Sequence, residues 1–124
     1  MIVGVGIELV DRQRFEALLD RYGDRLRARL FTDGEREYAA RKQRGGESLA
    51  VRFAAKIAAR RALRAGALRL RDIEVIRDRL GPPRLHLMGS AERAARDAGV
   101  TNIALTLSHD AKWCVGQVIL ESAP

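Results

Sequence analysis

The sequence contains a single cysteine, Cys114, so it cannot form an internal disulfide, and a reducing compartment is indicated. No apolar run comes near the roughly 20 residues that a membrane-spanning helix needs. Met1 leads directly into a strand-like run, without the basic leader and apolar region of a signal peptide. We therefore expect a cytoplasmic protein that does not use the membrane.

Several classes of functional site are missing as well. The two histidines, His86 and His109, have no neighbouring ligands at zinc spacing. The chain has no Walker loop, dinucleotide fingerprint or nucleophile elbow. Aromatic residues make up 5% of the chain, and no strand carries the aromatic and basic side chains of an RNA-binding platform. This argues against nucleic acid as a partner, and leaves Leu, Val, Ile and Ala to form the core.

Arginine, by contrast, is abundant. Lys and Arg number 23 against 16 Asp and Glu, a formal net charge of +7, and all but three of the basic residues are arginines. This balance alone favours an acidic partner, whether nucleic acid, a phosphorylated small molecule or an acidic protein. The planar guanidinium fork suits phosphate and carboxylate groups in particular. The alternative is an arginine-rich surface that is merely solvated.

The length of 124 residues fits a single domain over 1–124 with one core. Periodicity and turn residues predict an α+β fold with a mainly antiparallel sheet packed on a long helix. Thr32 and Glu35 have capping-box spacing, Gly45 and Gly46 indicate a loop, and Ser90 is placed to cap a helix. The expected strands cover 1–10, 71–78, 84–89, 102–109 and 112–121, and the expected helices start near 11, 26, 32, 48 and 90, the long one covering 48–65.

Polar residues near the ends of these elements are the candidates for chemistry. They are Glu8 and Asp11 after the first strand, Lys56, Arg60, Arg61 and Arg64 on the long helix, and Ser108, His109 and Asp110 after a late strand. Each also has an ordinary structural explanation: a charge at a strand end, a solvated helix face, or a turn in which Ser and Asp bond local backbone. The residues alone predict a basic α+β domain that binds an anion.

Five segments, taken in order, resemble one known family over almost the full chain. "GVGIELVDRQRF" is similar to the opening of the holo-acyl-carrier-protein synthases, G-I-G-[IL]-D-[IL]-[VT]-E, and "FTDGEREY" is similar to their F-T-x-x-E stretch. "RFAAKIAARRAL" resembles R-F-A-A-K-E-A-x-x-K-A. "DIEVIRDRLGPPRLHL" resembles their D-I-E-V and G-x-P strand pair, and "LTLSHDAKWCVGQVILE" their closing strands.

The resemblance implies a homotrimer with active sites in the clefts between subunits. It also implies a transferase that uses Mg²⁺ to move 4′-phosphopantetheine from coenzyme A to a serine of an acyl carrier protein, in fatty acid or polyketide biosynthesis. The carrier protein is an acidic partner, and by this match Arg14 and Arg21 would face it. Residues implied to bind coenzyme A are Arg52, Lys56, Arg64, Gly66, Ser108 and His109, and those implied to be catalytic are Glu8, Arg61 and His109.

The chain departs from the family pattern at the reaction centre. The metal-binding Asp of the pattern is Glu8 here, and the second metal ligand, a Glu, is Ile57. The catalytic Lys is Arg61, and the glycine that admits phosphate to the backbone is Arg64. Isoleucine cannot coordinate Mg²⁺, and a guanidinium cannot serve as a proton donor with a tuned pKa.

Three functions are therefore open at this point. The chain is an active phosphopantetheinyl transferase, with Mg²⁺ held by Glu8, Asp11, coenzyme A phosphates and water. In the second hypothesis, the chain is a repurposed relative that binds or acts on groups tethered to a carrier protein, with Glu8 or His109 as acid or base. In the third hypothesis, it is a non-catalytic binding protein that keeps the trimer and its clefts.

Overall fold

The computed structural model describes residues 1–124. The elements follow the predicted order, except that the helices expected from 11 and from 26 form one kinked helix over residues 12–30 and a short 3-10 turn is added, and the α+β class is confirmed. None of the helices combines the length and the apolar character that a membrane crossing requires. The elements are β1 (Ile2–Asp11), α1 (Arg12–Leu30), α2 (Asp33–Ala40), α3 (Gly45–Leu63), η1 (Leu70–Asp72), β2 (Ile73–Arg77), β3 (Pro83–Leu87), α4 (Gly89–Asp97), β4 (Val100–His109) and β5 (Trp113–Ser122).

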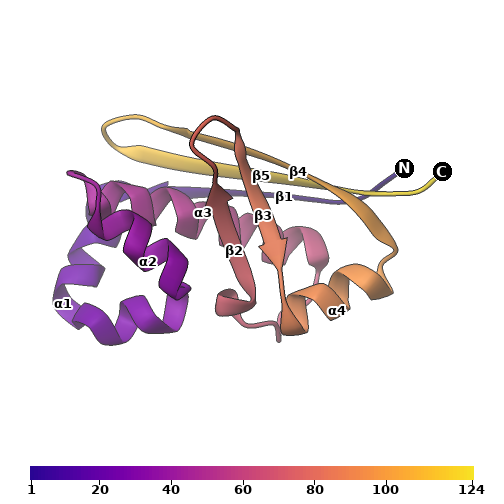
Figure 1. The fold of residues 1–124 in the computed structure, drawn as a ribbon, viewed down its shortest axis with the longest axis horizontal. Helices are drawn as coiled ribbons and strands as arrows, with labels where there is room; N and C mark the ends of the chain where they lie inside the picture. Colours follow the sequence, from indigo (N-terminus) through magenta and orange to yellow (C-terminus); the bar gives the residue numbers. More distant parts are fainter.

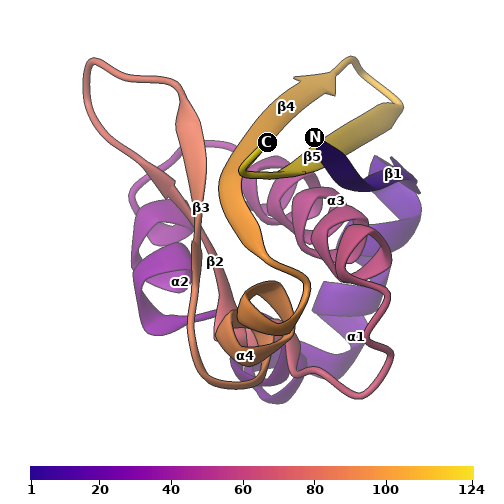
Figure 2. The same ribbon diagram turned by 90° about the vertical axis from the view of Figure 1, so that its right-hand side faces the viewer.

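Two antiparallel sheets flank the long helix α3. The larger sheet has the strand order β1-β5-β4, and the smaller one is the β2–β3 hairpin. Figures 1 and 2 show the three long strands along one side of α3, with the hairpin and α2 on other sides of it. The two chain ends lie together, and the amino group of Met1 donates to the carbonyl oxygen of Ser122 at 3.0 Å. In this arrangement α3 lies at the centre of the molecule, and its sides face different elements.

Glycines allow α3 to lie close against the larger sheet. A Cβ added at Gly4 or Gly6 would collide with backbone carbonyl oxygens of α3, and one added at Gly116 would stand 2.6 Å from the backbone nitrogen of Ala55. The facing residues of α3 are alanines that are fully buried. The first strand therefore approaches the backbone of α3 closely.

The opposite face of the larger sheet is apolar and uncovered. Val5, Ile7 and Leu9 of β1 are 54%, 56% and 53% exposed. Their neighbours across β5 include Ile119, opposite Val5, and Val115, opposite Leu9. Each chain therefore presents a largely aliphatic sheet face to its surroundings.

Two expectations about helix ends were wrong. Gly45 and Gly46 do not form a loop but lie in the first turn of α3, where a Cβ at Gly45 would stand 2.6 Å from the carbonyl oxygen of Ala39. Ser90 does not cap α4 with its own oxygen. Its backbone N–H and its hydroxyl both donate to the carboxylate of Asp72, at 2.9 and 2.6 Å. The cap thus comes from a residue 18 positions earlier.

The capping box at the start of α2 is confirmed. Thr32 Oγ1 accepts from the N–H of Glu35, and a carboxylate oxygen of Glu35 accepts from the N–H of Thr32. The two helical segments expected from 11 and from 26 form a single helix, α1, which Gly23 interrupts with φ 64° and ψ −150°. The capping box could be predicted because its two residues are only three positions apart in the sequence.

Candidate active site

The Glu8–Arg61 pair lies where β1 passes the C-terminal half of α3. Arg61 Nη1 donates to a carboxylate oxygen of Glu8 at 3.2 Å and to the backbone carbonyl oxygen of Ile7 at 2.9 Å. The same Glu8 oxygen also accepts from the N–H of Leu9 at 3.1 Å. The structure thus brings together two of the predicted catalytic residues, and the positive charge of Arg61 neutralises the negative charge of Glu8.

Ile57 lies one helical turn before Arg61 and is 6% exposed. It offers no oxygen at the position where the family pattern has its second metal ligand. Asp11, the other carboxylate considered for Mg²⁺, accepts from the N–H of Arg14 at 3.1 Å and caps α1. No three His, Cys, Asp or Glu side chains come together as ligands anywhere in the chain. Mg²⁺ is usually held by one or two carboxylates together with substrate phosphates, but the one carboxylate offered here, that of Glu8, is already paired with Arg61, so the donor set does not fit a Mg²⁺ ion.

A second candidate surface is a basic pocket of about 340 Å³ on the far side of α3. It contains two of the predicted coenzyme-binding residues, Arg52 and His109. Four basic side chains, of Lys42, Arg44, Arg52 and Arg77, line it, but only one carboxylate does, that of Glu47. The pocket is therefore suited to a polyanion. Its lining residues are Tyr38, Lys42, Gln43, Arg44, Glu47, Ser48, Val51, Arg52, Arg77, Pro83, Leu107 and His109.

Arg52 is held rigidly at the wall of this pocket. Its Nη1 donates to Ser48 Oγ at 2.8 Å, and its guanidinium carbon lies 4.1 Å from the centre of the Tyr38 ring. Its Nε is buried and has no hydrogen-bond partner in the chain. A buried donor without a partner is costly, so an incoming anion that approached it would relieve that cost.

Tyr38 has an electrostatic response to the same cations. Partial burial of the phenol on its own would raise its pKa, but the positive charges of Arg52 and Lys42 outweigh burial and lower the pKa from its ordinary value. The lowered pKa of Tyr38 thus has its cause in the same cations that line the pocket.

His109 is oriented by a carboxylate at the start of α3. Its Nδ1 lies 3.3 Å from a carboxylate oxygen of Glu47, whose other oxygen accepts from Arg12 Nη1 at 2.9 Å. With Nδ1 engaged in this way, Nε2 of His109 is the ring nitrogen left for a ligand. Glu47 was not among the predicted residues.

Besides Glu47, four charged or aromatic residues of the pocket were not predicted. Tyr38, Lys42 and Arg44 come from the end of α2 and the segment before α3, and Arg77 comes from the end of β2. Only the charges of the segment 41–44 hinted at them, since it holds three basic residues in four positions. Arg77 reaches the pocket through the position of the hairpin, which no local pattern specifies.

Lys56 is not available to a ligand, contrary to the expectation that it binds coenzyme A. Its side chain is fully buried, and its ammonium pairs with Glu35 at 2.5 Å. The other carboxylate oxygen of Glu35 accepts from the N–H of Val75 at 2.9 Å. Burial lowers the pKa of Lys56, while the charge of Glu35 opposes that effect. The pair ties α2, α3 and β2 together, and its role is structural.

The remaining predicted coenzyme-binding residues are at the surface. Arg64 ends α3 with φ 54° and ψ 34°, and Gly66 follows in the turn. Ser108 is exposed on the outer sheet face, opposite Val115. Arg64 follows the last residue of α3, three positions after Arg61, and it does not line the basic pocket.

Arg14 and Arg21, the predicted carrier-protein contacts, are both exposed on α1. Leu18 lies between them at helical spacing and is 42% exposed, and the neighbouring Tyr22 is 53% exposed. The guanidinium carbon of Arg21 lies 5.4 Å from the centre of the Tyr22 ring. This face of α1 combines two cations with two apolar side chains.

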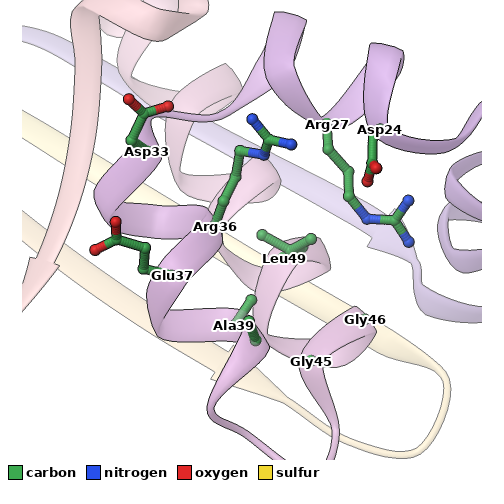
Figure 3. A pocket seen from close by; sticks show the side chains of 10 residues that line it. Asp24, Arg27, Asp33, Arg36, Glu37, Ala39, Gly45, Gly46 and Leu49 are labelled. Atoms are coloured by element: carbon green, nitrogen blue, oxygen red, sulfur yellow. The ribbon is translucent and has the colours of Figure 1, made fainter.

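A larger hollow of about 540 Å³ lies between α1, α2 and the start of α3, and Figure 3 shows its side chains. It contains none of the predicted site residues. Three carboxylates, of Asp24, Asp33 and Glu37, and two guanidinium groups, of Arg27 and Arg36, line it. Its charge is mixed, so it has no preference for an anion comparable to that of the basic pocket.

The Glu8–Arg61 pair and the basic pocket are separated by α3 itself. Arg52 and Arg61 are nine positions apart, and at about 100° per residue they project from opposite sides of a helix that is roughly 10–12 Å wide. One chain therefore presents two partial sites that face in different directions.

The chain is similar to proteins of one family throughout its length. The family model described as the 4′-phosphopantetheinyl transferase superfamily matches residues 4–115. A holo-[acyl-carrier-protein] synthase of Solibacter usitatus is 42% identical, covering 98% of this chain and 100% of the relative.

Solved structures agree with this match. The holo-[acyl-carrier-protein] synthase of Neisseria meningitidis superposes with a TM-score of 0.88 at 28% identity, covering 98% of this chain and 100% of that one. The holo-(acyl-carrier-protein) synthase of Bacillus anthracis, solved in complex with CoA (3′,5′-ADP), gives 0.79 at 34% identity, with 99% of each chain covered. The chain therefore belongs to the 4′-phosphopantetheinyl transferase superfamily.

Proposed function

We propose that the protein is a holo-acyl-carrier-protein synthase, a single-domain cytoplasmic enzyme that transfers 4′-phosphopantetheine from coenzyme A to a serine of an acyl carrier protein. The basic pocket carries this proposal. Four permanent cations and the unpartnered Nε of Arg52 surround it, which suits the phosphates of coenzyme A. The family match over residues 4–115 supplies the reaction class.

The proposed reaction forms a bond between the serine oxygen of the carrier protein and the phosphorus of the phosphopantetheine group. The phosphorus–oxygen bond to 3′,5′-ADP breaks, and the leaving group takes the electron pair. Glu8 is the carboxylate that can accept the serine proton. Arg61 and Arg64 balance charge on the phosphates. No step is assigned to Mg²⁺, because the donor set does not fit it.

Mass spectrometry of the carrier protein tests the proposal directly. Apo carrier protein is incubated with coenzyme A and the protein, and a mass gain equal to one phosphopantetheine group is expected. A known transferase with the same carrier serves as the positive control. The proposal fails if several carrier proteins are modified by the control enzyme and none by this protein.

The role of the basic pocket is tested by Arg52→Gln. We expect at least about tenfold weaker coenzyme A binding, since a charged hydrogen bond contributes about 1.5–3 kcal/mol. Arg36→Gln, in the mixed-charge hollow, is the matched control with the same change of charge. Thermal melting of both variants checks that the fold is intact, and equal affinities would contradict the assignment.

A second candidate function is supported by Ile57 and the Glu8–Arg61 pair. A homologue that binds acyl-carrier-protein-tethered groups without transferring phosphopantetheine would need the basic pocket and the face on α1 but no metal ligands. The same mass measurement separates the two functions. A carrier that binds tightly but gains no mass would favour this second function.

We propose that the carrier protein binds the exposed face of α1 that bears Arg14, Leu18, Arg21 and Tyr22. Acidic residues of the carrier would pair with the two arginines, and Leu18 would be buried. Arg14→Glu is expected to weaken carrier binding, whereas the exposed Arg29→Glu on a later turn of α1 is the control. Unchanged carrier affinity in Arg14→Glu would contradict this docking face.

We also propose that the functional unit is a homotrimer. Because Arg52 and Arg61 project from opposite sides of α3, a ligand that contacts both needs two chains. The exposed aliphatic face of β1 and β5 is a surface on which copies of the chain could associate. In such an assembly the basic pocket of one chain would complete the Glu8–Arg61 centre of its neighbour.

A further inference from the structure

Arg61 provides a permanent positive charge at the reaction centre. Its Nη1 contacts both the carbonyl oxygen of Ile7 and the carboxylate of Glu8, at 2.9 and 3.2 Å. The carboxylate that a divalent cation would need as a ligand is therefore already neutralised by a cation of the chain itself. A metal ion at Glu8 would have to displace the guanidinium or be repelled by it.

Arg61 retains donors for a second anion. Its hydrogen bonds within the chain use Nη1 alone, whereas a guanidinium has five N–H donors. The side chain is 57% exposed, so its remaining edge is open to solvent. The planar fork matches the geometry of a phosphate group.

The charged residues at the motif positions of this chain carry the same total charge as those of the family pattern together with a divalent cation. At the motif positions of the sequence, Glu8, Arg61 and Arg64 carry one negative and two positive charges, a net charge of plus one, and Ile57 contributes none. A centre with Asp, Glu and Lys around a divalent cation, as in the family pattern, also carries plus one. The loss of one carboxylate and the gain of one arginine thus replace a divalent ion without changing the total charge offered to a phosphate.

We infer that the Glu8–Arg61 centre binds the diphosphate of coenzyme A without a divalent cation, with the guanidinium of Arg61 in the position and role of that cation. This rests on the proposed function for its ligand. It does not depend on turnover, because it concerns how the diphosphate is held before any transfer.

Coenzyme A binding to the intact protein, measured by calorimetry without carrier protein, tests the inference. The affinity is expected to be the same within about twofold in EDTA and in Mg²⁺, a difference of less than about 0.5 kcal/mol. Binding that is tenfold or more tighter in Mg²⁺ would overturn the inference. Absence of binding in both conditions would overturn it as well, together with the proposed function.

Transfer measured in the same two conditions separates the inference from the proposed function. Coenzyme A that binds equally in EDTA and Mg²⁺, with no mass gain on any carrier, would uphold the metal-free centre and contradict the transferase. Mass gain only in Mg²⁺, with binding that also needs Mg²⁺, would uphold the transferase and contradict the metal-free centre.

Arg61→Gln removes the charge that the inference requires. We expect at least about tenfold weaker coenzyme A binding in EDTA. Arg60→Gln makes the same change one position earlier, where the side chain lines a different hollow beside Leu68, and should bind as the unaltered protein does. Equal coenzyme A affinity in the Arg61→Gln and Arg60→Gln proteins would overturn the inference.

Mn²⁺ provides a readout that is independent of coenzyme A. The unaltered protein is expected to leave the electron paramagnetic resonance signal of free Mn²⁺ unchanged. The double variant Ile57→Glu with Arg61→Lys, which restores the second carboxylate, is expected to bind Mn²⁺ and reduce the signal. Binding of Mn²⁺ by the unaltered protein, lost in Glu8→Gln, would show that Glu8 is a metal ligand after all and overturn the inference.

Discussion

Arg64 adopts a conformation that an arginine rarely takes. It ends α3 with φ 54° and ψ 34°, in the left-handed region, where contact between Cβ and the following carbonyl oxygen costs about 1–2 kcal/mol. The family pattern has glycine here, and the backbone angles give a conformational reason for it in addition to phosphate access. The chain tolerates this strain while gaining a cation at the centre.

Arg64→Gly is therefore expected to raise the free energy of unfolding by up to about 1 kcal/mol, the relief of strain less the added entropy of the unfolded chain. Arg60→Gly is the matched control in the right-handed interior of α3, and it should lower the free energy of unfolding by about 1 kcal/mol. Urea denaturation of both variants measures the two effects. Destabilisation by both would contradict the assigned strain.

Cys114 illustrates how burial suppresses the chemistry of a nucleophile. It is fully buried on β5, between Val10 of β1 and His109 of β4. Burial raises the pKa of its thiol to about 11, and the negative charge of Glu47 adds to that effect. At neutral pH the thiolate is therefore almost absent, although the residue is the only cysteine.

We expect iodoacetamide to leave Cys114 unmodified in the folded protein near pH 8, and to modify it fully in urea. Raising the pH should increase labelling of the folded protein only as the thiol approaches its raised pKa. Peptide mass spectrometry after timed labelling gives the rate. Labelling at the rate of a free thiol near pH 8 would show that the site opens readily.

The junction between η1 and α4 depends on a single carboxylate. Asp72 accepts from the hydroxyl and the N–H of Ser90, at 2.6 and 2.9 Å, and its own carbonyl oxygen accepts from the N–H of Met88 at 2.8 Å. These hydrogen bonds, that of the Ser90 hydroxyl foremost, lower the pKa of Asp72. The carboxylate thus acts as the N-terminal cap of α4 and attaches that helix to the end of η1.

Asp72→Asn is expected to lower the free energy of unfolding by about 1 kcal/mol at neutral pH. Because the folded pKa lies below the ordinary value of 3.8, the contribution is fully present above that value and is lost as the pH falls through the lowered folded pKa. The difference between the two proteins should therefore shrink in acid. Asp78→Asn, at an exposed ion pair with Arg84, is the control and should change stability by less than about 0.5 kcal/mol.

Features of helices and strands that depend on residues close together in the sequence could be predicted, whereas features that depend on residues far away in the sequence could not. The capping box of Thr32 and Glu35 lies within one short segment, so the sequence indicated it. Gly45 and Gly46 looked like a loop because their reason to be glycine is the neighbouring carbonyl of Ala39.

The candidate site divides in the same way. The resemblance to the family indicated Glu8, Arg61, Arg52 and His109 as site residues, but the sequence did not indicate that they fall into two groups on opposite sides of α3. Lys56 matched the family motif and was assigned to ligand binding, whereas its charge is buried against Glu35. A match to a family motif therefore does not show whether a residue has a catalytic or a structural role.

The proposed homotrimer would connect the two groups of site residues through the exposed sheet face. Val5 of β1 is 54% exposed and lies opposite Ile119 in an aliphatic surface. If three copies bury this face, a carboxylate placed in it would be desolvated without a partner, at a cost of several kcal/mol. The trimer should then dissociate, and each basic pocket should lose the neighbouring Glu8–Arg61 centre.

Val5→Glu is accordingly expected to reduce the mass measured by light scattering from about three times the chain mass of 13.8 kDa to a single chain. Coenzyme A binding should fall with it, because Arg52 and Arg61 of one chain cannot reach the same diphosphate. Leu80→Glu, at a 99% exposed position in the β2–β3 turn, makes the same type of substitution elsewhere and should leave mass and affinity unchanged. A monomer that binds coenzyme A as tightly as the unaltered protein would show that one chain holds the complete site, and the two-chain arrangement would have to be abandoned.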